Sequence, residues 1–261
     1  MNEDKLTLAL AEDKLTQCRD HYMITNTNFL DMRQQTICKN VGRGCGDVRA
    51  FYYGGYGDAE RRVAVFVPDY VGAESQEQLL AYFSENKEDN PLTLIRAKHS
   101  GYKALSHRDY LGSLTGMGIK REAIGDILVS ENGADILILK EMLDFLLLNY
   151  GKAGRTYLEL TAEELSDIYI PEGLTEEKSC TVASLRLDNV VAAAFGLSRG
   201  KAAEAIKAGL VFVNSMQMAK AEKSLSQGDK IVLRGKGKVI LKEIGGNTRK
   251  DRIFIMLTLM K

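Results

Sequence analysis

The spacing of apolar residues changes along the chain, and its first part combines a helical period with one short buried strand. The helical period runs from the N-terminus to about residue 28. Glycine-rich turns follow at 42–46 and 54–57, and the apolar run Arg62–Pro68 then predicts a strand that its proline ends. The pattern predicts a mixed α/β domain over residues 1–73.

A second segment, residues 74–165, has the element order of a ferredoxin-like unit. Its pattern predicts strands and helices in the order β-α-β-β-α-β, and Glu131-Asn-Gly133 is a hairpin signal between the two central strands. The predicted strands cover 92–97, 124–129, 135–139 and 156–160, and the predicted helices cover 107–117 and 141–150. RNA-recognition motifs share this order and stack bases on aromatic residues of the central strands. The two central strands here contain no aromatic residue, so we do not expect base stacking there; contacts to phosphates or to a protein stay open.

The last segment, residues 182–261, predicts two short helices followed by a small sheet. Ser184 is expected to cap the first helix and Ser198 the second, and Gly196 to end the first. The apolar positions Leu187, Val190, Val191 and Ala194 fall on one face of the first helix, and Ala202, Ala205, Ile206 and Gly209 on one face of the second. Strands are expected at 210–214, 231–233 and 253–259, with a mobile basic tip at 234–238.

These segments together predict an α+β protein. Its parts would be an N-terminal mixed α/β domain (1–73), a middle domain like the RNA-recognition motif (74–165) and a compact C-terminal domain (182–261). Residues 166–181 are rich in glutamate and contain Pro171 and Gly173, so they are expected to form a linker.

Charge is distributed unevenly between these parts, although the chain holds 35 basic and 35 acidic residues. Residues 182–261 contain 15 Lys and Arg against 6 Asp and Glu, a balance of +9, and the other 181 residues hold 20 basic and 29 acidic residues, a balance of −9. A basic module on an acidic body is typical of proteins that bind a polyanion.

The cysteines and the N-terminus indicate a cytoplasmic protein without a metal site. Cys18, Cys38, Cys45 and Cys180 have no C-x-x-C spacing, and the three histidines do not cluster with them. The first residues lack the basic start and apolar block of a secretion signal, and no apolar stretch is long enough for a membrane span. We expect no membrane association and no cofactor.

Basic and polar side chains of the last segment are the candidate RNA-binding residues. Arg199 and Lys207 share an exposed stripe of the second helix with the small residue Ala203, and a helix N-terminus offers free N–H groups to a phosphate. The full candidate set is Arg186, Asn189, Ser198, Arg199, Lys201, Lys207, Arg234, Lys236 and Lys238.

Several separated motifs resemble known RNA-binding proteins. Leu185-Arg-Leu-Asp-Asn189, Leu197-Ser-Arg199, Gly209-Leu-Val-Phe-Val-Asn214, Gly228-Asp229 and Arg234-Gly-Lys-Gly237 occur in the order of the S4-like RNA-binding domain. Upstream, Asn28-Phe-Leu-Asp-Met-Arg33, Gly54-Gly-Tyr56, Ala59-Glu-Arg61, His107-Arg-Asp-Tyr-Leu-Gly112, Gly118-Ile-Lys-Arg121 and Gly125-Asp126 resemble the YlmH family. The resemblance covers the chain from about residue 16 to its end.

The resemblance implies a cytoplasmic bacterial protein of ribosome-associated quality control that is not an enzyme. Family members are implicated in binding large ribosomal subunits obstructed by peptidyl-tRNA. By this resemblance Arg186 and Arg199 would contact ribosomal RNA of the large subunit and tRNA, with ribosomal proteins as further partners.

Two alternatives stay open: an RNA-modifying enzyme of the pseudouridine synthase or methyltransferase type, and an adaptor at the division site. Arg186-Leu-Asp188 matches the letters of a pseudouridine synthase motif, but Asp188 falls at a helix start, where a carboxylate is expected on dipole grounds. The glycine-rich loop 42–46 lacks the strand that precedes a nucleotide-binding loop. His107 and Asp109 have no nucleophile or metal partner in sequence, so we expect no catalytic residue.

Overall fold

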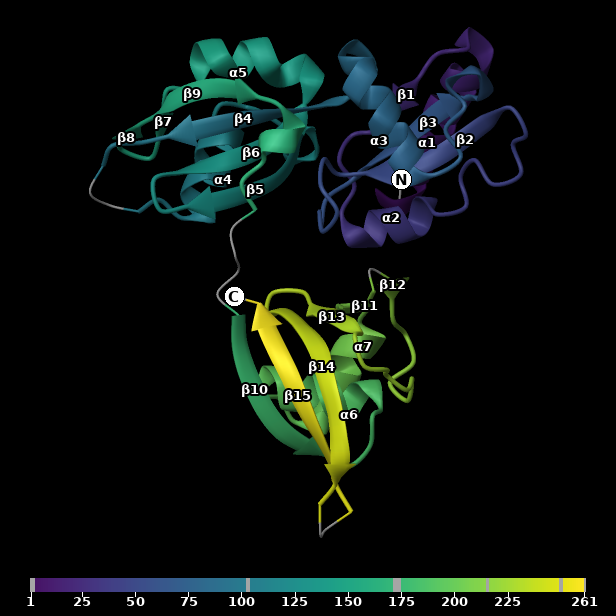
Figure 1. Ribbon diagram of the computed structural model, residues 1–261, viewed down its shortest axis with the longest axis vertical. Coiled ribbons are helices and arrows are strands. Elements are labelled where there is room, and N and C mark those ends of the chain that lie inside the picture. Colours follow the sequence, from purple (N-terminus) through teal and green to yellow (C-terminus); the bar gives the residue numbers. More distant parts are fainter. Residues whose placement is uncertain (1–2, 102–103, 171–174, 215, 249–250, 261) are drawn as a thin grey trace. The chain divides into compact units, whose positions relative to one another are not determined.

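The computed structural model describes residues 3–101, 104–170, 175–214, 216–248 and 251–260 (Figure 1). The chain divides into two compact units, Met1–Pro171 and Glu172–Lys261. Helices and strands occur in both, which confirms the predicted α+β class.

The N-terminal part of the first unit is a three-stranded sheet in the order β1-β3-β2. Its elements are α1 (Glu3–His21), β1 (Thr25–Asn26), α2 (Met32–Cys38), β2 (Val48–Tyr53), β3 (Val63–Pro68) and α3 (Gln76–Glu85). Strand β3 confirms the predicted strand, and all of its residues are buried because both of its faces are covered. Helix α1 ends seven residues before the predicted position of about 28, and Tyr22 directly after it has a φ of 52° that helical geometry does not allow.

The middle part has the predicted strand order of a ferredoxin-like unit. Its elements are β4 (Leu92–Lys98), α4 (His107–Gly116), β5 (Ile124–Ser130), β6 (Gly133–Leu139), α5 (Leu143–Asn149), β7 (Lys152–Ala153), β8 (Thr156–Tyr157) and β9 (Glu159–Glu163). The sheet order β5-β6-β4-β9 places β6 and β4 in the centre and β5 at an edge, so of the two strands expected to be central only β6 is. Neither β4 nor β6 contains an aromatic residue. The predicted last strand, 156–160, is divided, because Thr156–Tyr157 pairs with β7 in a separate hairpin and only β9 joins the main sheet.

Both faces of the middle sheet are covered. Tyr110 and Leu114 of α4 and Leu146 of α5 pack on one face, over which α5 can be followed in Figure 1. The opposite face carries Leu92, Leu94, Leu137 and Leu139, which pack against Phe29, Tyr53, Val63, Val65 and Leu79 of the N-terminal part. Residues 1–73 and 74–165 therefore share one core and do not form two separate domains.

The second unit packs two helices on a six-stranded antiparallel sheet. Its elements are β10 (Thr175–Val182), α6 (Leu187–Phe195), α7 (Arg199–Lys207), β11 (Val211–Val213), β12 (Met216–Gln217), β13 (Lys230–Leu233), β14 (Gly237–Asn247) and β15 (Ile253–Met260). The sheet order is β10-β15-β14-β13-β11-β12, and β10, β15 and β14 lie side by side in Figure 1. The predicted inward positions of α6 are all buried, as are Ala202 and Ile206 of α7, while Ala205 and Gly209 are half-buried.

The predicted linker 166–181 is wrong over most of its length. Thr175–Val182 is strand β10, and its whole length pairs with β15. At the other end, Tyr169 N donates to Asp135 Oδ2 at 2.7 Å, and Arg96 Nη2 donates to Asp167 O at 2.6 Å. Strand pairing at one end and hydrogen bonds at the other thus assign both ends of this segment to folded units.

Two local predictions in the second unit also need correction. Ser184 does not cap α6, because the cap position belongs to Arg186, while Ser184 Oγ accepts a hydrogen bond from Asn189 Nδ2 at 2.8 Å. The expected mobile tip at 234–238 is a tight turn between β13 and β14, closed by Lys236 N donating to Leu233 O at 2.9 Å. Ser198 does cap α7, and Gly196 ends α6 with a φ of 63°, both as predicted.

Candidate nucleic-acid interface

Arg186 and Arg199, which start the two helices of the second unit, meet on the carboxylate of Asp188. Arg186 donates from Nε to Oδ1 and from Nη2 to Oδ2, both at 3.1 Å, and Arg199 Nε donates to Oδ2 at 2.9 Å. The backbone N–H of Asn189 donates to Oδ1 at 2.9 Å. Two cations far apart in sequence are therefore held by one anion at the beginning of α6.

This arrangement is buried at its base and exposed at its tips. The side chain of Asp188 is only 5% exposed, whereas those of Arg186 and Arg199 are 41% and 59% exposed. Burial alone would raise the pKa of Asp188, but the hydrogen bonds and positive charges of the two arginines outweigh it and hold the pKa below its ordinary value. The carboxylate therefore stays ionised at neutral pH, and solvent reaches both guanidinium groups.

Three other predicted residues lie near the helix starts. Asn189 follows Asp188 in the first turn of α6, and its side chain is held by Ser184. Ser198 accepts a hydrogen bond from Lys201 N at 3.3 Å, as a capping residue does. The side chain of Ser198 therefore orders α7, and Lys201 is exposed within the same turn as Arg199.

The remaining predicted residues lie toward the other end of α7. Lys207 is eight residues beyond Arg199, a rise of about 12 Å along the helix axis. Arg234 N donates to Leu210 O at 2.9 Å, which places the β13–β14 turn with Lys236 and Lys238 next to the chain that leaves α7. The structure thus separates the predicted residues into a group at the helix starts and a group around the β13–β14 turn.

Two lysines that the sequence pattern did not indicate lie beside Arg186. The loop between β12 and β13 runs along residues 185–188: Leu187 N donates to Lys223 O at 2.8 Å, and Asp188 N donates to Ala221 O at 3.0 Å. Lys220 and Lys223 of this loop are exposed. Only the tertiary pairing brings them to the helix starts, and no periodicity or motif in the sequence marks them.

Comparisons with known proteins assign both units of the chain to known families. Residues 185–231 match the model of the S4 domain, and residues 86–167 match a model described as "Putative RNA-binding domain in YlmH". The chain is 34% identical over 234 residues to the ribosome-associated protein quality control protein P2 of Bacillus subtilis (strain 168), covering 90% of this chain and 86% of that protein.

The chain belongs to the YlmH family. A solved structure, the cell division protein ylmH from Streptococcus pneumoniae, matches 65% of this chain and 96% of its own with a TM-score of 0.50 and 22% identity, a likeness of fold alone. Membership confirms the resemblance read from the sequence: this is an S4-domain protein of an RNA-binding family. Strands β10, β14 and β15 lie outside the matched S4 region and enlarge its sheet.

In this YlmH-family protein the sheet of the middle part is closed to bases. The face on which RNA-recognition motifs stack bases lies opposite the helices. Here that face carries Leu94 and Leu137, both fully buried against the N-terminal part. The central strands lack aromatic residues for stacking, and their exposed face in an RNA-recognition motif is here covered by the N-terminal part.

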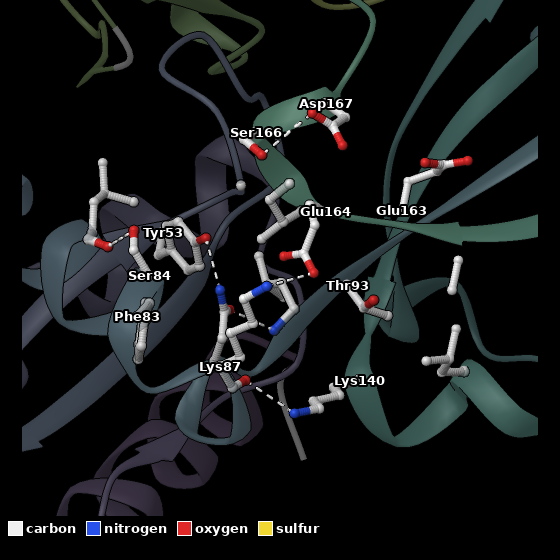
Figure 2. A pocket seen from close by; sticks show the side chains of 17 residues that line it. Tyr53, Phe83, Ser84, Lys87, Thr93, Lys140, Glu163, Glu164, Ser166 and Asp167 are labelled. Atoms are coloured by element: carbon white, nitrogen blue, oxygen red, sulfur yellow. Dashed lines mark hydrogen bonds and ion pairs between the residues drawn. The ribbon is translucent and has the colours of Figure 1, made fainter.

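A pocket of about 690 Å³ lies beside this internal contact, between α3 and the segment that follows β9. Figure 2 shows Lys87 paired with Glu164 at 2.8 Å, and Lys140 Nζ donating to Lys87 O at 3.0 Å. Tyr53 accepts a hydrogen bond from Asn90 at 3.3 Å. The lining contains both basic and acidic side chains, so the pocket presents no concentration of one charge to a ligand.

The enzyme-like features of the sequence have structural roles. Asp109 forms a capping box with Ser106 at the start of α4, and the glycine-rich loop 42–46 lies between helix α2 and strand β2, the reverse of the order in a nucleotide-binding loop. Within the described ranges, no three His, Cys, Asp or Glu side chains gather as metal ligands would. Among the same residues, no helix has both the length and the apolarity of a membrane span.

Proposed function

We propose that this protein binds structured ribosomal RNA and tRNA through its S4 domain, on large ribosomal subunits obstructed by peptidyl-tRNA in ribosome-associated quality control. The observation that carries the proposal is the pair Arg186 and Arg199 on the ionised carboxylate of Asp188. The printed name of the Bacillus subtilis relative supports the quality-control context.

Geometry and charge together favour a phosphate ligand at this place. The planar guanidinium group of arginine can donate two parallel hydrogen bonds to phosphate oxygens. Both arginines lie at helix N-termini, where free N–H groups and the helix dipole also attract anions. Lys201 is exposed in the first turn of α7, and Lys220 and Lys223 are exposed on the loop that pairs with residues 187 and 188. The +9 balance of residues 182–261 extends the attraction beyond the site itself.

The first test measures RNA binding by the full chain. Arg186→Ala and Arg199→Ala should each weaken binding to purified large subunits carrying peptidyl-tRNA by about 1–3 kcal/mol. The control replaces Arg19 and Arg49 of the first unit by alanine, because each is about half-exposed and pairs with an acid, although with an exposed one of its own. Equal losses in the Arg186→Ala, Arg199→Ala double variant and in this control would refute the predicted face.

The second test locates the RNA in growing cells. Crosslinking followed by sequencing should give reads on large-subunit ribosomal RNA and on tRNA that are lost in the Arg186→Ala, Arg199→Ala double variant. Reads spread over unrelated RNAs, or unchanged by the substitutions, would contradict the proposal.

Binding should also weaken steeply with salt. Each phosphate that the protein neutralises releases counterions, so a site with about four phosphate contacts should show a slope of about −3 in log K against log salt. The slope should fall by about one when a phosphate-binding arginine is removed. A flat salt dependence would exclude a phosphate-binding mode altogether.

A further inference from the structure

We propose that Asp188 is a positioning residue that holds Arg186 and Arg199 as a single clamp on one phosphate of the bound RNA. The inference rests on the proposed function and assigns a role within its site to a residue that carries the wrong charge for RNA. A negative charge at the centre of an RNA-binding surface weakens the attraction of that surface for phosphate groups. Asp188 must therefore contribute to binding in another way.

The shared oxygen fixes the distance between the two arginines. Arg186 Nη2 is 3.1 Å and Arg199 Nε is 2.9 Å from Asp188 Oδ2, so these nitrogens are at most 6.0 Å apart. Without the carboxylate, two like charges at this distance would repel each other and the long side chains would move apart. Asp188 therefore brings together two cations that start on different helices.

The hydrogen bonds to Asp188 leave donors on both guanidinium groups. A guanidinium has five N–H groups. Arg186 gives two of them to Asp188, and Arg199 gives one, from Nε. Among the described residues no other hydrogen bond involves either side chain, so the Nη1 and Nη2 edge of Arg199 and Nη1 of Arg186 keep donors for a phosphate.

The burial pattern shows which part of the clamp is fixed. Asp188 is anchored from below by the N–H of Asn189, and its own N–H donates to Ala221 O. The carboxylate therefore has a fixed position, from which the two exposed arginines extend. Such preorganisation lowers the entropy that ordering two flexible side chains would otherwise cost on binding.

The Asp188→Asn substitution distinguishes two models of the site by whether RNA binding becomes weaker or tighter. If the domain were a diffuse polyanion binder, loss of a negative charge would strengthen RNA binding. If Asp188 positions the arginines, binding should weaken about tenfold even though the site becomes more positive. The control is Glu222→Gln, which removes an exposed acid whose charge raises the pKa of Arg186 but which holds neither arginine, and which should leave binding equal or tighter.

A second variant tests the clamp without touching the buried carboxylate. Arg199→Lys keeps the charge but replaces the planar guanidinium by a compact ammonium, which cannot present one edge to Asp188 and a second, bidentate edge to a phosphate. We expect it to lose most of what Arg199→Ala loses. In the Asp188→Asn background, Arg199→Ala should cost several-fold less than in the wild type, since the two residues act as a unit.

The full-length variants are compared for RNA affinity by fluorescence anisotropy, and for the exchange of the Arg186 and Arg199 Nε–H groups by NMR. The clamp predicts weaker binding and loss of slowly exchanging Nε–H signals in Asp188→Asn, with backbone amide spectra of α6 and α7 retained. Unchanged or tighter binding by Asp188→Asn together with wild-type affinity of Arg199→Lys would overturn the inference while leaving the proposed function intact. Failure of the wild-type chain to bind RNA would instead overturn the proposed function.

Discussion

Leu137→Ala tests whether the sheet of the middle part is locked to the N-terminal part. Leu137 lies on β6 with no exposed surface, on the face opposite the helices. Its side chain fills the space between the strands and the turn at Gly55, where an added Cβ would come within 2.7 Å of Leu137 Cδ2. Truncation leaves a cavity in a close-packed core, and Leu-to-Ala changes of this kind cost about 2–5 kcal/mol.

Tyrosine fluorescence provides a selective assay for this change. All 11 tyrosines of the chain precede residue 172, so their signal reports on the first unit alone. Urea unfolding followed by this signal should show one transition, with a midpoint well below that of the wild type in Leu137→Ala. The first unit then unfolds as one body, because its two parts share the core that the substitution damages.

Leu148→Ala is the matched control, since it removes the same atoms from a residue of α5 that is 84% exposed. It should change the free energy of unfolding by no more than about 0.5 kcal/mol. If 1–73 and 74–165 were independent domains, Leu137 would lie on the solvent side of its sheet, and the two substitutions would have similar small effects. That outcome would refute the shared core.

Three further predictions concern single groups. The pKa of Asp188 is lowered by its arginines, so the stability it gives is present above the pKa of an unfolded aspartate and lost on acidification; circular dichroism should show acid unfolding below about pH 4 that is less pronounced in Asp188→Asn. Burial raises the pKa of Cys18 and of Cys38 to about 11, so both thiols should react with iodoacetamide at pH 7.5 only after urea is added, and rapid labelling of the folded chain would contradict their burial. Gly125→Ala places a Cβ 2.7 Å from the Phe29 ring and should destabilise the first unit by about 1–3 kcal/mol in the urea assay, whereas Gly112→Ala, in open space on α4, should be neutral or slightly stabilising.

Elements with local signals were predictable from the sequence. The hairpin of β5 and β6 follows from Asn132-Gly133 between two apolar runs, and α6 follows from apolar positions at helical spacing between Arg186 and Gly196. In each case the residues that determine the structure are neighbours in sequence. Propensity and period then point to the same answer as the tertiary structure.

Strand β10 was not predictable, because its partner lies far along the chain. Its sequence, Thr175-Glu-Glu-Lys-Ser-Cys-Thr-Val182, is polar because β10 is an edge strand, and Thr175 pairs with Met260. Charged residues on such an edge also discourage pairing with other chains. A polar edge strand and a linker have similar composition, so only the observed register distinguishes them.

The candidate site was predictable in its cations and not in its organisation. The sequence motifs and the helix positions identify Arg186 and Arg199 as candidates. Their shared contact with Asp188 depends on how α6 and α7 pack against each other. Asp188 lies at a helix start, where the helix dipole favours a carboxylate. The dipole argument does not predict its hydrogen bond with Arg199, eleven residues away. Lys220 and Lys223 were missed for the same reason, since a loop pairing places them.

The two units differ in the kind of contact that each can make with an RNA. The first unit uses its sheet face internally, and residues 1–171 hold 19 basic and 26 acidic residues, a balance of −7, so both stacking and phosphate attraction are weak there. The second unit is basic and keeps its arginines exposed around a fixed carboxylate. Because RNA affinity comes mainly from phosphate contacts, the S4 domain should supply most of the binding energy.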